Sequence, residues 1–353
     1  MIPARRRLTR LTLIATLAML VALVAAPSVS AAEQTITSAG PLTEIIIGDR
    51  LNCQVSHVSD TSNEFFGGEP LGACGTFVVA GGVLYNPASV PAGSSATVGT
   101  DYTPVSQTPV TGSGTAADPY RIVTVVTLGT SGLTLTETDS YVIGREFYQT
   151  DVMLTLAAGG AASLAATVYR AGDCYLQNSD AGFGSVDAAS GAVRCVAAAD
   201  PLNPAAGPGT RIEEWVPLTA GSTYYQANYS EVWSLIGAMS PFPNTCECAE
   251  YQDNGAGLSW QFTVLGGSSA TVSHVTNFSP TGISVVPTPT PTPTPVAPTP
   301  TPTPTPLATA LPNTAAQDLG ATGLALILTA VMLVGSVGGL AFAHRSNLRH
   351  RNR

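Results

Sequence analysis

Few residues in this chain are suited to catalysis. Two histidines, His57 and His274, lie in the segment 33–286, and no Gly-x-Ser-x-Gly or other nucleophile motif accompanies them. Lysine occurs nowhere among the 353 residues, which excludes Schiff-base chemistry and lysine-linked isopeptide bonds. The neighbouring carboxylates Glu213 and Glu214 could serve glycoside hydrolysis, but adjacent residues of a strand point to opposite faces. We therefore predict no catalytic residues, with an extracellular glycosidase or lyase as the alternative.

Aromatic residues gather late in the same segment. They include the three tryptophans of the chain, Trp215, Trp233 and Trp260. Flat rings bordered by carboxylates can stack on sugars, so these tryptophans are candidate glycan contacts. Packing inside a sandwich core is the competing interpretation. We predict a binding or structural role, with an extracellular glycan or protein as the ligand.

Two groups of acidic residues could supply oxygen ligands to Ca²⁺. They are Asp173, Asp180 and Asp187, and Glu247, Glu250 and Asp253. Neither spacing matches an EF-hand loop. We therefore predict no metal or other cofactor, and keep Ca²⁺ as the one ion that these residues would suit.

Six cysteines, all within 33–286, indicate an oxidising compartment and a disulfide framework. They are Cys53, Cys74, Cys174, Cys195, Cys246 and Cys248. The first two lie 21 residues apart, as do the next two, and this spacing favours two local pairs. The last two are separated only by Glu247. A bond between them would be strained and easily reduced, so they could instead reach separate partners such as the second pair.

The chain is rich in β-branched residues, glycine and turn formers, which is typical of an all-β fold. The sequence between Leu133 and Asp139 alternates apolar and polar residues, which predicts one face on a core and one in water. Gly159-Gly160 predicts a hairpin turn. Strands are predicted at 75–83, 121–128, 133–142, 147–156, 162–169, 222–229, 258–264 and 270–276.

The two ends of the chain predict export and anchoring. Residues 1–32 have the four arginines, the uncharged run and the small residues of a signal peptide. Residues 319–343 are uncharged and long enough for a transmembrane helix. The tail 344–353 carries four arginines and should stay in the cytoplasm by the positive-inside rule. The segment 33–286 is then an extracellular domain.

A pentapeptide precedes this predicted span, and it consists of Leu311, Pro312, Asn313, Thr314 and Ala315. Pentapeptide, span and basic tail, in this order, resemble the cell-wall sorting signal of LPxTG-type surface proteins. In that family a sortase attacks the carbonyl of the threonine and passes the protein to a cell-wall precursor. The resemblance implies cleavage between Thr314 and Ala315, and sortase as a transient partner. Ala315 stands where the family has glycine and adds a Cβ there, so we expect inefficient cleavage and a mixture of wall and plasma-membrane anchoring.

Pro-Thr repeats fill residues 287–306 of the segment 287–310. Alternating proline favours polyproline II, so twenty such residues extend roughly 60 Å. This segment is predicted to be a stalk. The segment 33–286 that it carries has 22 acidic residues against six arginines, and this acidic balance makes nucleic acid an improbable partner.

Three stretches of the exported segment support a second resemblance. They are Tyr148-x-Thr-Asp-Val152, Tyr169-Arg-Ala-Gly-Asp-Cys-Tyr175, and Pro243-Asn-Thr-Cys-x-Cys248 followed by Tyr251-Gln-Asp-Asn-Gly255. They resemble a domain of uncharacterised secreted proteins of actinobacteria and related groups, and the strand pattern is similar to large sandwiches of the galactose-mutarotase type. Neither resemblance implies an activity. We predict a large antiparallel β-sandwich ectodomain, a Pro-Thr stalk and one C-terminal transmembrane helix.

Overall fold

The computed structural model describes residues 33–58, 71–87, 99–176 and 179–282. The chain divides into two compact units, 1–290 and 291–353, and every described residue belongs to the first. The predicted signal peptide 1–32, stalk 287–310, pentapeptide 311–315, span 319–343 and tail 344–353 lie outside the described residues. Within the described part, no helix is long and apolar enough to cross a membrane.

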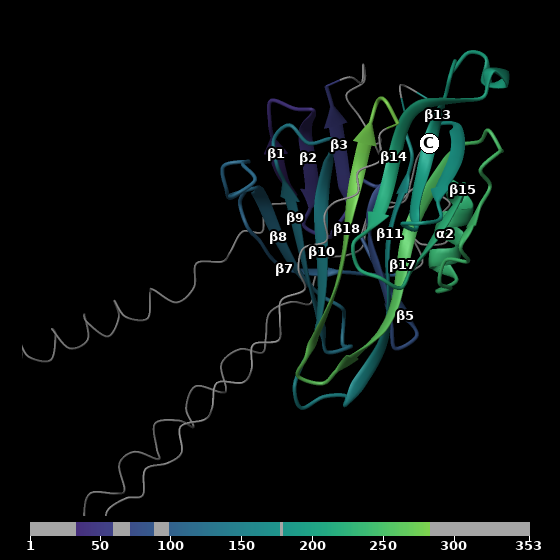
Figure 1. The fold of residues 1–353 in the computed structure, drawn as a ribbon. Coiled ribbons are helices and arrows are strands. Elements are labelled where there is room, and N and C mark those ends of the chain that lie inside the picture. The colour runs from purple at the N-terminus through teal and green to yellow at the C-terminus, as the bar shows by residue number, and fades with distance from the viewer. Residues whose placement is uncertain (1–32, 59–70, 88–98, 177–178, 283–353) are drawn as a thin grey trace, which may run out of the picture. The chain divides into compact units, whose positions relative to one another are not determined.

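Two large β-sheets dominate the described part of the chain (Figure 1). The strands of the eight-stranded sheet, in spatial order, are β12 (Gly182–Asp187), β13 (Ala192–Ala198), β14 (Pro208–Pro217), β18 (Ser269–Ser279), β10 (Phe147–Leu156), β9 (Leu133–Tyr141), β8 (Tyr120–Thr127) and β7 (Thr103–Gln107). Those of the seven-stranded sheet are β16 (Thr245–Cys246), β15 (Ser222–Asn228), β17 (Asn254–Leu265), β11 (Ser163–Asp173), β4 (Cys74–Ala80), β5 (Val83–Asn86) and β6 (Thr100–Asp101). Neighbouring strands are antiparallel, except for β15 with β16 and β5 with β6, so the predicted antiparallel β-sandwich is confirmed for the described residues.

A third, smaller sheet contains β1 (Glu33–Thr37), β2 (Leu42–Gly48) and β3 (Cys53–His57). Its apolar residues, such as Ile45, Ile47 and Val55, are buried in the same hydrophobic cluster as residues of both large sheets. The helix α2 (Tyr229–Gly237) follows β15 directly and begins at Asn228, whose side chain accepts a hydrogen bond from the Ser230 backbone N–H. A short 3₁₀ helix, η2 (Pro204–Ala206), precedes β14.

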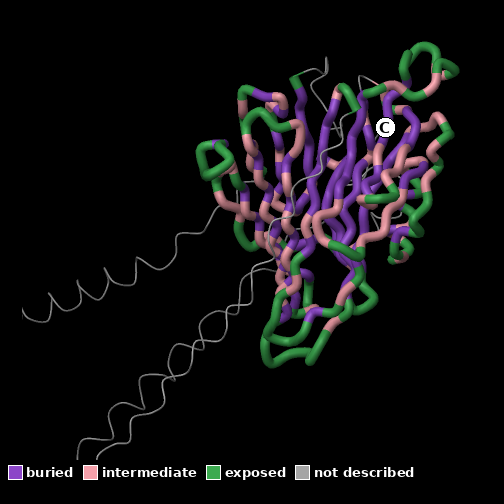
Figure 2. Tube along the Cα trace, in the orientation of Figure 1, coloured by how far each residue is buried: buried purple, intermediate pink, exposed green. Residues whose placement is uncertain are grey.

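Period-two alternation explains which side chains form the core. In β10, Tyr148, Thr150, Val152, Leu154 and Leu156 are buried, while the residues between them are partly exposed. The two large sheets bury such faces against each other, and Figure 2 shows the buried residues running through the interior with exposed residues at the loops.

The predicted strand positions correspond to strands of the structure, with one difference in arrangement. Strands β8, β9 and β10 form consecutive antiparallel pairs, as expected from their spacing. The next strand, β11, pairs with β17 and β4 in the other sheet and not with β10. The hairpin predicted at Gly159-Gly160 is therefore wrong, because the chain passes there from one large sheet to the other. Local spacing predicts strands, but it does not say which sheet each strand joins.

Candidate functional site

The three tryptophans considered as glycan contacts lie inside the protein. Trp215, Trp233 and Trp260 are 1%, 0% and 2% exposed. Trp260 donates its indole N–H to the Thr219 carbonyl at 3.0 Å, and the Trp233 ring lies 5.3 Å from the Phe77 ring. The structure does not bring these residues together on a surface, and their rings have the contacts of core residues.

The neighbouring carboxylates Glu213 and Glu214 are both fully buried and belong to opposite faces of β14. Glu214 accepts a bond from Arg194 Nε at 2.6 Å and from Asn277 Nδ2 at 3.0 Å. Glu213 stands opposite Phe278 on the neighbouring strand, on the side of the main core. The two side chains therefore do not form the facing acid pair of a glycoside hydrolase.

Both histidines of the exported segment are buried. His57 is 1% exposed, with its Nε2 2.6 Å from an Oε of Glu146. His274 is fully buried, and burial, reinforced by the charge of Arg170, lowers its pKa well below the usual value. Burial therefore keeps the His274 imidazole neutral.

A charged cluster that the sequence analysis did not identify occupies the space between the two large sheets. Arg170 of β11 is 1% exposed, and Glu137 and Asp139 of β9 are fully buried. The guanidinium donates to the Tyr148 hydroxyl at 2.8 Å, and its Nη1 lies 3.6 Å from an Oε of Glu137. Asp139 accepts a bond from the Thr150 hydroxyl at 2.7 Å. This cluster joins the sheets through charges that are shielded from water.

Burial decides the protonation of this charged cluster. It raises the pKa of Asp139 well above the usual range, and the negative charge of Glu137 raises it further. Burial also raises the pKa of Glu137, whereas Arg170 lowers it. One guanidinium with one ionised and one protonated carboxyl makes a neutral cluster, and we assign the proton to Asp139. Because all three side chains are enclosed, their role in this conformation is structural.

Acidic residues from both predicted groups meet near one end of β11. The ligand oxygens of Asp173, Asp180 and Asp253 lie within 4.8 Å of one another, an arrangement that could hold a metal ion. Burial, with the charges of Asp253 and Asp180, raises the pKa of Asp173 to about 8. Burial and Asp180 raise the pKa of Asp253 to about 6. These three residues would supply only part of the six to eight oxygens that Ca²⁺ takes.

The other acidic candidates are not part of this acidic cluster. Asp187 accepts bonds from the Ala189 backbone N–H at 3.0 Å and the Ser190 hydroxyl at 2.9 Å, which lower its pKa. Glu247 and Glu250 are exposed. Sequence spacing grouped Asp173 with Asp187, but the turn after β12 directs Asp187 to its own local hydrogen bonds.

Replacing Asp173 with asparagine is expected to stabilise the protein at pH 8. The raised pKa means that the folded state holds a proton that the unfolded state releases, so stability falls as pH rises from about 4 to about 8. Asparagine does not titrate, so the variant lacks this dependence of stability on pH. Because Asp173 is partly exposed, we reduce the expected effect to a gain of roughly 1–2 kcal/mol in the free energy of unfolding at pH 8, with little change at pH 4. Urea unfolding at several pH values measures the difference.

Asp187→Asn is the matched control for this prediction. The pKa of Asp187 is lowered, so its carboxylate stabilises the folded protein above about pH 4, and this stabilisation is lost in acid. Its replacement should therefore slightly destabilise the protein at pH 8. Equal stability curves for Asp173→Asn and the wild type would contradict the raised pKa of Asp173.

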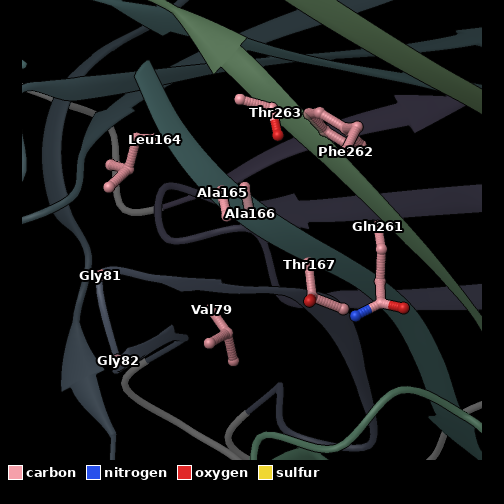
Figure 3. A pocket seen from close by; sticks show the side chains of 10 residues that line it. All are labelled: Val79, Gly81, Gly82, Leu164, Ala165, Ala166, Thr167, Gln261, Phe262 and Thr263. Atoms are coloured by element: carbon pink, nitrogen blue, oxygen red, sulfur yellow. The ribbon is translucent and has the colours of Figure 1, made fainter. Parts of the chain in front are cut away.

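An open groove of about 540 Å³ lies on the outer face of the seven-stranded sheet, over β4, β11 and β17. Figure 3 shows Thr167 between Gln261 and Val79, its partners on the two neighbouring strands. The full lining of the groove is Val79, Gly81, Gly82, Leu164, Ala165, Ala166, Thr167, Gln261, Phe262 and Thr263. None of these residues is charged, in contrast to the acidic composition of the domain.

Helix α2 determines where this groove begins. The outer-face residues Phe77 and Tyr169 are buried in a cluster with Trp233 of α2 and with Phe242 of the loop that follows the helix. Farther toward the start of β11, Ala165 is exposed. The sequence does show small and uncharged residues at alternate positions of β11 and β17. This pattern indicates a groove only when the position of α2 is known.

The described residues contain three disulfides. Two are the local pairs favoured by spacing, Cys53 to Cys74 and Cys174 to Cys195, with Cα–Cα distances of 5.2 and 6.4 Å. Cys174 follows β11 in one large sheet and Cys195 lies in β13 of the other, so this bond joins the sheets. The third bond joins Cys246 to Cys248, with a Cα–Cα distance of 5.0 Å. Such bonds are typical of an oxidising, extracellular environment.

Comparisons with known proteins do not assign this chain to a family. No family model matches the chain, and no curated protein matches it. Heparan sulfate lyase HepC from Pedobacter heparinus is similar over 67% of this chain and 33% of its own length, with 6% identity and a TM-score of 0.35. A galactose mutarotase related enzyme from Lactobacillus acidophilus is similar over 71% of this chain and 99% of its own, with 8% identity and a TM-score of 0.34. The chain thus spans about a third of the lyase, and scores this low carry no argument about activity.

Proposed function

We propose that this chain is a surface-displayed, non-enzymatic binding protein that recognises neutral glycans through the groove on the outer face of β4, β11 and β17. The observation that carries the proposal is the groove's lining. Thr167, Thr263 and Gln261 offer hydroxyl and amide groups that both donate and accept hydrogen bonds, as sugar hydroxyls do. Val79 and Ala165 add apolar surface for the C–H faces of a sugar ring. The volume is within the range of small-ligand sites.

The distribution of titratable groups supports binding without turnover. General acid–base catalysis requires groups within hydrogen-bond reach of the substrate. The carboxyls of Glu137 and Asp139 are enclosed between the sheets, and none of the residues that line the groove can titrate. The acidic cluster is separated from the groove along β11, since Asp173 lies eight residues, about 25 Å of strand, from Ala165.

Glycan binding by the purified protein tests this proposal. We expect a glycan array to show binding to neutral polysaccharides, and Gln261→Ala and Thr167→Val to weaken it at least about 10-fold, because two hydrogen-bonding groups of the groove are lost. Thr134→Val, a partly exposed position of β9 in the other sheet, is the matched control and should bind normally. Silence on the array, or binding unaffected by both groove variants, would exclude this site. Turnover of a bound polysaccharide would instead favour the alternative of a glycosidase or lyase.

We further propose that the protein is displayed by sortase-type anchoring through Leu311-Pro-Asn-Thr-Ala315. The support is the order of pentapeptide, uncharged span and arginine-rich tail in the sequence. We expect mass spectrometry of cell-envelope fractions to find wall-linked chains that end at Thr314 beside membrane chains that retain Arg353. Ala315→Gly should increase the wall-linked share, because it removes the Cβ from the residue that follows the cleaved bond. If only intact C-termini are found, with or without Ala315→Gly, sortase is not involved and the span is a plain membrane anchor.

A further inference from the structure

The disulfide between Cys246 and Cys248 differs from the other two in its exposure and in its ring size. The four cysteines of the other bonds are at most 3% exposed, whereas Cys246 and Cys248 are both only partly buried. Cys246 and Cys248 enclose a single residue, so their bond removes little freedom from the unfolded chain. It therefore contributes little to stability and is open to reagents in solution.

The surroundings of Cys246 favour its reduced form. Its Sγ lies 3.1 Å from Oε1 of Gln226, a residue that is fully buried in β15. A disulfide sulfur carries no proton. In the oxidised state Oε1 of Gln226 therefore receives no hydrogen bond from Cys246. In the described structure, Nε2 of Gln226 also has no hydrogen-bond partner. Reduction gives Cys246 an S–H that can donate to Oε1.

The position of Gln226 is fixed by its neighbours. The Gln226 amide packs against Gly184 of β12, in the space that a Cβ at position 184 would occupy. The backbone N–H of Glu247 donates to the Gln226 carbonyl at 2.9 Å, and that of Gly184 donates to the Cys248 carbonyl at 3.2 Å. These backbone bonds do not depend on the disulfide, so the loop can keep its place when the S–S bond is cut.

We infer that Cys246 and Cys248 form a reversible thiol–disulfide exchange site for extracellular thiols, a chemistry separate from the proposed glycan binding. An incoming thiolate attacks Sγ of Cys248, the S–S bond breaks, and Cys246 leaves as a thiolate. This thiolate takes a proton from water, and the resulting S–H donates a hydrogen bond to Oε1 of Gln226. A second thiol attacks the mixed disulfide, releasing the Cys248 thiol and the oxidised external thiol. Two external thiols are oxidised for each protein disulfide reduced.

The charges around the site select among thiols. Glu247, between the two cysteines, and Glu250 place two exposed carboxylates beside the disulfide, so they repel anionic thiols and attract cationic ones. We therefore expect cysteamine to react faster than mercaptoethanesulfonate at low salt, after each rate is divided by the rate of the same thiol with an uncharged model disulfide. The preference should weaken as salt is added.

Graded reduction of the native exported chain, purified in detergent without reductant, tests the inference. The chain is equilibrated with mixtures of reduced and oxidised dithiothreitol, trapped with N-ethylmaleimide and digested with chymotrypsin for mass spectrometry. We expect the pair Cys246 and Cys248 to be half reduced at a ratio of reduced to oxidised dithiothreitol at least about 10-fold lower than the ratio that half reduces the other two pairs. The melting temperature should not change when only this pair is reduced. Simultaneous reduction of all three pairs, or reduction of this pair last, overturns the inference.

A substitution at Gln226 tests the mechanism separately. Gln226→Met removes the amide that gains a hydrogen bond on reduction, so the disulfide should become roughly 5-fold harder to reduce. Gln54→Met replaces another buried glutamine, on β3, and should leave the titration of this pair unchanged. An unchanged titration for Gln226→Met would overturn the role of Gln226. If that variant does not fold, the wild-type titration still decides whether the site exchanges.

Discussion

Replacing Arg170 with leucine is expected to lower the free energy of unfolding by about 3–5 kcal/mol at pH 7, or to prevent folding. The guanidinium is the positive partner of Glu137 and also donates to the Thr76 and Tyr148 hydroxyls. Without it, Glu137 must either remain charged between two apolar layers or take up a proton. Urea unfolding of the purified variant measures the loss.

Two controls separate this effect from the loss of any charge. Arg121→Leu removes an exposed arginine at the start of β8 and should change stability by less than about 0.5 kcal/mol. Asp139→Asn should be mild, because the raised pKa of Asp139 already keeps this carboxyl protonated at neutral pH. An Arg170→Leu variant as stable as the wild type would show that the charged cluster does not hold the two sheets together.

The alternation of β9 shows how much the sequence could reveal and where its interpretation stopped. The pattern from Leu133 to Asp139 correctly predicts a strand with one buried face. The same period of two places Glu137 and Asp139 on the face of Leu133 and Leu135, which is the buried face. Charged residues at core positions are a signal of a buried ionic cluster, but their partner Arg170 lies on another sheet, and no local pattern links it to β9.

The site residues depended even more on contacts between distant parts of the chain. The acidic cluster joins Asp173, at the end of β11, to Asp253, just before β17, because these two strands pair in an antiparallel register. Sequence spacing had placed these residues in separate groups. The groove depends similarly on α2 covering only one end of the sheet face. By contrast, the two disulfides between cysteines 21 residues apart could be predicted, because sequence spacing favours pairs that close short loops.

The bond between Cys174 and Cys195 is expected to contribute about 3 kcal/mol to stability, the value for closing a loop of about 20 residues in the chain-entropy model. It connects the end of β11 to β13, and both sulfurs are enclosed in the main core. We expect the Cys174→Ala, Cys195→Ala double variant to unfold at a lower urea concentration and a clearly lower temperature than the wild type.

The double variant Cys246→Ser, Cys248→Ser is the matched control, because it also removes one disulfide and two sulfur atoms. Its ring encloses a single residue, and Glu247 and Cys248 are held by backbone bonds to β15 and β12, so we expect a change of less than about 1 kcal/mol. The difference in stability between the two double variants then measures how much more a buried disulfide between the sheets stabilises the protein than a disulfide within one loop. Equal losses in both variants would mean that the Cys246 to Cys248 bond supports the fold, and that this part of the chain needs it to stay in place. A larger loss for Cys174→Ala, Cys195→Ala would assign stability to the bond between the sheets and leave the partly buried pair, Cys246 and Cys248, free to exchange.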